Sequence, residues 1–180
     1  MVLNHIDPQA ISDDDNSTVY TAATPPETVV ANLMDEDYAS GDIKSNSSVP
    51  WPGSTFIIRS ASSGHVITLV DGQIILAPPG GRGSIHWACV ETKGWLGFRN
   101  TVSGRFLGHD DKRRLRCAAG KHQSWENFSV RLRPEGGYVM LMTHFERLWH
   151  VGIKKEQGVE KLAKIADGGN GGLVWEFVKV

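Results

Sequence analysis

Residues 95–130 read WLGFRNTVSGRFLGHDDKRRLRCAAGKHQSWENFSV, and this stretch decides the fold. It contains four short apolar runs that Gly, Asp and Ser residues separate, and little in it repeats at the period of a helix. The stretch therefore predicts four β-strands at residues 95–99, 105–107, 114–117 and 125–130.

The same order of runs and turns occurs once before this stretch and once after it. It predicts strands at residues 55–59, 66–69, 74–76 and 85–90, and again at 138–142, 147–151, 162–166 and 173–178. Gly64 and Gly104 lie 40 residues apart, Trp87 and Trp125 lie 38 apart, and Trp125 and Trp175 lie 50 apart. The longer last step predicts an insertion in the third unit, at the hydrophilic residues 154–158.

One four-stranded unit could not bury its apolar face, but three units around a common axis would share one core and leave few free strand edges. The predicted fold class is therefore all-β, a β-trefoil of three four-stranded repeats. Residues 103–107 and 125–130 carry a likeness to the fascin-like branch of the β-trefoil families, and the resemblance covers residues 54–180. It implies a non-enzymatic interaction module with a protein partner such as actin. We expect Trp87, Trp125 and Trp175 to fill the core.

Ricin-type lectins are also trefoils and give an alternative function, carbohydrate binding. Their repeats end in Gln-any-Trp, which here only Gln123-Ser124-Trp125 matches, since the other two units end differently. A lectin would show an ordered Asp or Asn beside an exposed aromatic side chain in a shallow pocket. Trp95 and Trp149 lie outside the predicted core triplet. One interpretation of either is a surface ring that stacks on a sugar or a base, but we expect each to be partly buried.

Charge divides the chain near Trp51. Residues 1–50 hold nine acidic residues and one lysine, a net charge of −8, whereas residues 51–180 hold eleven acidic and eighteen basic residues, a net charge of +7. The first segment is polar and predicts a disordered acidic tail, followed by the trefoil domain at 51–180. The asymmetry indicates either that the tail contacts the basic trefoil surface or that this surface meets an anionic partner.

The densest charged stretch is residues 110–116. We select Arg113, Arg114, Arg116 and Lys121 as candidate binding residues. Arg114 and Arg116 would project from the same face of a strand, and guanidinium groups suit carboxylates or phosphates. The alternative is a solvated turn in which Asp110 and Asp111 balance the cations. There is no strong nucleic-acid signal, because no recognised motif accompanies the modest positive excess.

No motif in the chain indicates catalysis. The seven histidines are scattered without zinc-site spacing, and Cys89 and Cys117 are single residues that we expect to be free thiols. The glycine clusters at 80–83 and 168–172 lack the Lys-Ser/Thr ending of a phosphate loop. We therefore predict no enzyme, no metal and no cofactor, with a small-molecule enzyme built from loop residues as a further alternative.

The first residues of the chain and its hydropathy indicate where the protein is located. The first residues lack the basic start and unbroken apolar run of a secretory signal, and no stretch is long and apolar enough to span a bilayer. We expect a cytoplasmic protein.

Overall fold

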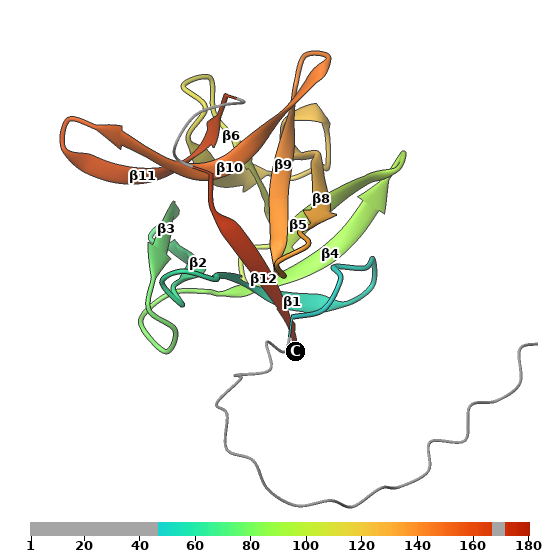
Figure 1. Cartoon of the computed structure of the whole chain (residues 1–180), viewed down its shortest axis with the longest axis horizontal. Helices are drawn as coiled ribbons and strands as arrows, with labels where there is room; N and C mark the ends of the chain where they lie inside the picture. Colours follow the sequence, from blue (N-terminus) through green and yellow to red (C-terminus); the bar gives the residue numbers. More distant parts are fainter. Residues whose placement is uncertain (1–46, 167–171) are drawn as a thin grey trace, which may run out of the picture. The chain divides into compact units, whose positions relative to one another are not determined.

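The computed structural model describes residues 47–166 and 172–180, and this part of the chain is all-β (Figure 1). A single turn of 3₁₀-helix, η1 (Ser124–Glu126), precedes β8, and no helix in these ranges has the length and hydropathy needed to cross a membrane. Residues 1–46 of the predicted acidic tail lie outside the described residues. Its last residues contact the trefoil, where the Ser48 N–H donates to the Phe177 carbonyl (2.8 Å) and the Phe177 N–H donates to Ser47 Oγ (3.0 Å). The strands are β1 (Thr55–Ser60), β2 (Val66–Val70), β3 (Gln73–Ala77), β4 (His86–Thr92), β5 (Trp95–Asn100), β6 (Phe106–His109), β7 (Leu115–Ala119), β8 (Phe128–Leu132), β9 (Tyr138–His144), β10 (Arg147–Glu156), β11 (Val159–Ile165) and β12 (Val174–Lys179).

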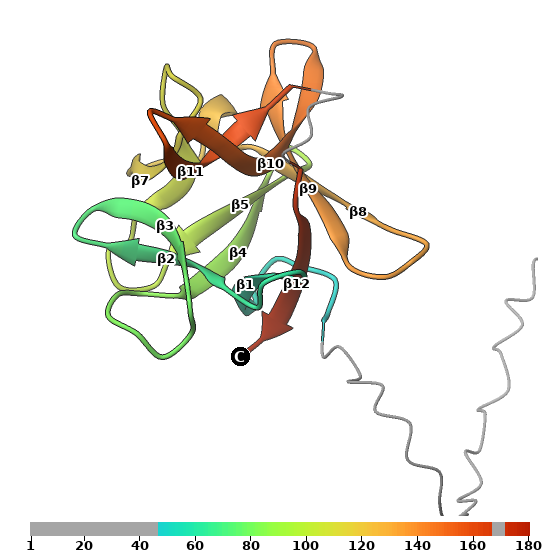
Figure 2. The ribbon, with the colours of Figure 1, turned by 60° about the vertical axis from the view of Figure 1, so that its left-hand side comes forward.

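Six strands close into a barrel. The antiparallel pairs run from β1 to β4, β5, β8, β9 and β12, and β12 pairs with β1 again. The other six strands form the hairpins β2–β3, β6–β7 and β10–β11, which lie beside one another in Figures 1 and 2 and are joined through β3, β7 and β11. This is the predicted β-trefoil.

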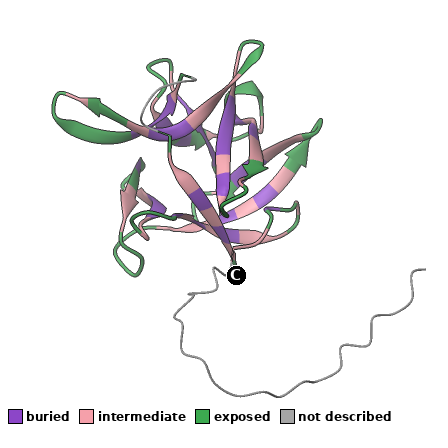
Figure 3. Ribbon diagram, in the orientation of Figure 1, coloured by how far each residue is buried: buried purple, intermediate pink, exposed green. Residues whose placement is uncertain are grey.

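The barrel strands alternate between core and surface. In β1 every second side chain is buried, as a strand with one face on a core requires. Buried positions follow the barrel interior in Figure 3, and exposed positions gather at the hairpin tips. The rings of Phe98 and Phe177 stack with their centres 5.7 Å apart, and Cys89 and Cys117 are buried free thiols.

Trp87, Phe128 and Trp175 occupy equivalent places in the three repeats, and all three are fully buried. The prediction that Trp125 fills this place was wrong, since Trp125 is 43% exposed. The physical reason is η1, where the Gln123 backbone N–H donates to the Glu126 carboxylate (3.2 Å) and the Glu126 N–H donates to the Gln123 carbonyl (3.0 Å). Because of this turn, β8 begins at Phe128, three residues after its predicted start at Trp125. The equivalence follows from the cross-strand partners, which are Phe56 and Asn100 for Trp87, Leu96 and Met142 for Phe128, and Tyr138 and Ser60 for Trp175.

The third repeat has the longest hairpin. β10 has ten residues, and its pairing with β11 runs from His150–Ile165 to Glu156–Val159. The predicted insertion at residues 154–158 therefore lies at the tip of this hairpin.

Candidate functional site

The four predicted binding residues separate into different environments. Arg114 forms an ion pair with Asp110 (2.7 Å) and donates to it through Nε (2.8 Å). Burial alone would raise the pKa of Asp110, but these bonds from Arg114 hold it below its ordinary value. Arg113 and Arg116 are exposed, and each guanidinium lies beside a tryptophan. Lys121 is exposed on the connection between β7 and η1 and joins neither group.

A cavity of about 720 Å³ lies among the three hairpins. Its floor contains the equivalent residues Ile74, Leu115 and Leu162, and its polar walls include Gln73, Arg116 and Glu160. Arg114 and Arg116 both line this cavity. No Trp, Tyr or Phe of the described residues lines it.

A second group of residues lies where the β6–β7 hairpin and η1 meet β9, β10 and β11. Trp125, on η1, stacks on His109 with ring centres 5.0 Å apart and planes inclined by 21°. The guanidinium carbon of Arg116 lies 5.6 Å from the centre of the same indole. We call the whole group the junction cluster, and it consists of His109, Arg113, Arg116, Trp125, His144, Trp149 and Lys164.

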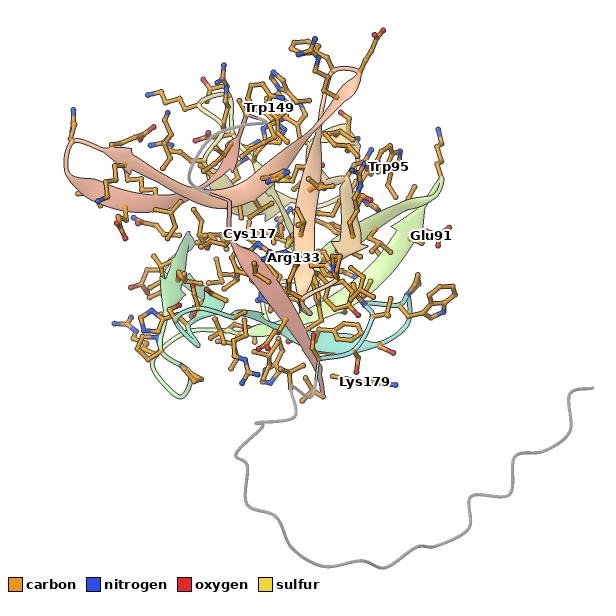
Figure 4. The ribbon with its side chains drawn as sticks, viewed as in Figure 1. Glu91, Trp95, Cys117, Arg133, Trp149 and Lys179 are labelled. Atoms are coloured by element: carbon orange, nitrogen blue, oxygen red, sulfur yellow. The ribbon has the colours of Figure 1, made fainter. Side chains whose placement is uncertain are left out.

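The other tryptophan of the junction cluster comes from the third repeat (Figure 4). Trp149 lies on β10, with the His144 ring 3.6 Å from its own and the Arg113 guanidinium 4.8 Å from its centre. Phe145, at the turn between β9 and β10, is 93% exposed and contacts His144 edge to face. Trp149 is partly buried, as predicted, and both tryptophans are flanked by a histidine and an arginine.

Lys164 joins the two halves of the junction cluster. It is only 3% exposed, and its Nζ donates to His109 Nε2 and to the Thr143 carbonyl, both at 2.8 Å. His109 Nδ1 lies 2.8 Å from the Asp110 carbonyl, and because a carbonyl only accepts, the hydrogen of the neutral ring is on Nδ1. Burial, together with the smaller effect of the charge of Arg113, lowers the pKa of Lys164 to about 8. Burial is also the largest cause that lowers the pKa of His109.

The pair of Lys164 and His109 breaks the internal symmetry. Lys164 pairs across its hairpin with Val151, and the corresponding residues of the other hairpins are Leu76 and Cys117. Their cross-strand partners are Ile67 for Leu76, Leu107 for Cys117 and Val151 for Lys164. His109 lies two residues after Leu107, and Leu69 and Ile153 lie two residues after the other two partners, so these three positions are equivalent. Two apolar positions are therefore replaced by a hydrogen-bonded polar pair in this junction alone.

Of the junction cluster, sequence reasoning selected only Arg113 and Arg116 as binding residues and considered Trp149 as a surface ring. It missed the pair of His109 and Lys164. His109 and Lys164 lie 55 residues apart and belong to different repeats. The available signal was a comparison of the three repeats, in which both residues replace apolar ones. That comparison needs the correct alignment, which the exposed Trp125 obscures.

No protein-family model and no curated protein matches the chain. Solved structures do resemble it. One is a ricin B-like lectin from Macrolepiota procera in complex with lactose, with a TM-score of 0.57, 15% identity, and coverage of 72% of this chain and 98% of the lectin. Another is an exo-β-1,3-galactanase from Clostridium thermocellum, with a TM-score of 0.57, 20% identity, and coverage of 71% of this chain and 30% of the enzyme.

A third is an endo-β-galactosidase from Clostridium perfringens that releases GlcNAcα1-4Gal, with a TM-score of 0.55 and 11% identity. It is matched over 71% of this chain and 33% of its own, so the chain spans about a third of the length of each of the two enzymes. At these identities the likeness shows the fold. It is a likeness to a ricin B-like lectin, and the fascin-like branch has no support among these structures.

Proposed function

We propose that this trefoil binds carbohydrate, and that the junction cluster is the binding site. The observation that carries the proposal is Trp125, which lies outside the core and exposes its indole while His109 holds its position. An exposed aromatic ring offers an apolar surface to the C–H face of a sugar, and neighbouring donors such as Arg116 suit its hydroxyl groups. A ring held in place in advance loses little entropy when it binds.

The comparisons supply the sugar to test first. The similar lectin holds lactose, and the two similar enzymes are named for a galactan and a galactoside. A β-galactoside is therefore the first ligand class that we propose for this chain.

We propose binding without catalysis. Most glycoside hydrolases use two carboxyl groups that flank the scissile bond. The junction cluster supplies cations, imidazoles and indoles, and none of its seven residues is an Asp or Glu. Its composition supports recognition rather than hydrolysis.

The test is a glycan array followed by isothermal titration of the full chain with lactose. We expect Trp125→Ala to weaken binding about tenfold, because it removes the aromatic surface. Trp51→Ala is the matched control, since Trp51 is 70% exposed and lies outside the junction cluster. Wild-type affinity in the Trp125→Ala protein, or a folded chain that binds no glycan, would contradict the proposal.

A further inference from the structure

The junction cluster gathers positive charge that no described carboxylate neutralises directly. Arg113, Arg116 and Lys164 take part in none of the ion pairs among residues 47–166 and 172–180. Asp110, on the hairpin turn, is already engaged by Arg114 through both carboxylate oxygens. Burial raises the pKa of Glu126, and the charge of Arg116 lowers it by less. The Glu126 carboxylate is buried and accepts the Gln123 N–H.

The cations of the junction cluster also act on one another. After burial, the charges of Lys164 and Arg113 are the causes that lower the pKa of His144. The charges of Lys164 and His144 also lower the pKa of His109, whereas the charge of Asp110 raises it. Like charges held together in this way disfavour the folded state unless an anion offsets them.

Two guanidinium groups of the junction cluster are available to such an anion. Arg113 lies at a left-handed turn position (φ 68°) that presents its side chain over Trp149, and Arg116 lies beside Trp125. Both side chains are exposed, and neither donates a hydrogen bond to a described protein group. The fork of N–H groups matches the oxygens of a carboxylate or a sulfate.

We propose that the junction cluster binds an acidic carbohydrate, whose sulfate ester or carboxylate is held by the guanidinium groups of Arg113 and Arg116 while a neighbouring sugar ring packs on Trp125. This inference rests on the proposed function, because the sugar ring supplies the contact with the indole. Buried Lys164 does not touch the ligand, and its charge adds to the field at the two arginines.

The experiment compares four ligands by isothermal titration of the full chain: lactose, a sulfate ester of lactose, a disaccharide that carries a uronic acid, and inorganic sulfate. We expect at least one acidic sugar to bind about tenfold more tightly than lactose, since bonds to charged groups are the stronger ones. The two acidic sugars distinguish sulfate from carboxylate as the group recognised. The advantage should fall as salt is added, because both arginines are exposed.

Two variants assign the effect to the junction cluster. Arg113→Gln and Arg116→Gln should each weaken the binding of the acidic sugar more than the binding of lactose, so that the preference for the acidic sugar falls severalfold. Arg113→Lys keeps the charge but loses the fork, and it should give an intermediate preference. Lys121→Gln is the matched control, because Lys121 is an exposed cation outside the cluster.

The failures of the two proposals are distinguishable. Equal affinity for lactose and both acidic sugars, or a preference that survives both glutamine variants, overturns the acidic ligand and leaves carbohydrate binding intact. Inorganic sulfate bound as tightly as the acidic sugar shows an anion site without a sugar, which overturns this inference. A folded protein that binds none of the sugars overturns both proposals.

Discussion

Lys164 is a buried amine at a position that is apolar in the other two repeats, and its titration makes the stability of the fold depend on pH. Its pKa is lowered from 10.5 to about 8 in the folded chain. Between those values the unfolded chain binds a proton that the folded chain does not. The free energy of unfolding should therefore rise with pH across this window, by roughly 1–3 kcal/mol.

Urea unfolding at a series of pH values from about 8 to 10.5 measures this rise. Lys164→Met keeps the length of the side chain and removes the titrating group, so its stability curve should be flatter than that of wild type. Parallel curves for the two proteins would show that Lys164 titrates near its ordinary pKa.

Trp125 shows where prediction from the sequence ends at the scale of one residue. Three tryptophans in similar positions indicated a core triplet, and two of them, Trp87 and Trp175, are indeed buried. The third buried aromatic is Phe128, because a local capping turn delays β8. The energies of such a turn are about as large as those of one core contact, so the apolar pattern alone does not decide between the two alignments.

At the scale of elements, η1 depends on a glycine in the neighbouring strand β6. A Cβ on Gly108 would lie 2.8 Å from a Glu126 carboxylate oxygen and 2.9 Å from the Trp125 carbonyl. Because the second atom belongs to the backbone, Gly108→Ala must displace η1. We expect a loss of about 1–3 kcal/mol in stability, a shift in Trp125 fluorescence and weaker glycan binding.

Gly120→Ala is the matched control for this substitution. A Cβ on Gly120 would meet only the end of the Arg105 side chain, at 2.9 Å, and that side chain can move. Unfolding curves and fluorescence spectra of both variants provide the measurement. If Gly108→Ala is as stable as Gly120→Ala, the close packing of η1 on β6 does not fix Trp125.

The strands themselves were predictable because each contains a short apolar run between turn residues. All twelve predicted runs correspond to strands, and β8 starts three residues after its predicted start. β10 continues to Glu156, well past the predicted end near Val151. Its last residues are charged and have no apolar pattern, and they are held in the sheet by pairing with β11 and by the ion pair of Lys155 with Glu160 (3.4 Å).

At the scale of the whole molecule, threefold repetition made the fold predictable and concealed the site. The repeats share an apolar pattern, so the core follows from what they have in common. The junction cluster depends on what they do not share, and its residues come from the second and third repeats. Only Arg113 and Arg116 stood out in sequence, because charge density is a local property and contact between repeats is not.

The same symmetry allows a test of why the polar pair is present. Replacing both His109 and Lys164 by Leu restores the residue type found at the equivalent positions Leu69 and Leu76. His109→Leu alone removes one of the two acceptors of a buried ammonium, and we expect it to cost about 1–3 kcal/mol. The double substitution should recover most of that loss, because apolar replacements of a buried polar pair are often neutral or stabilising.

Urea unfolding of wild type, both single variants and the double variant completes a double-mutant cycle. Costs that simply add would show that the two residues are not coupled in the folded chain. A double variant about as stable as wild type that no longer prefers acidic sugars would mean that the trefoil folds without the pair. The pair would then serve the charge of the site rather than the stability of the core.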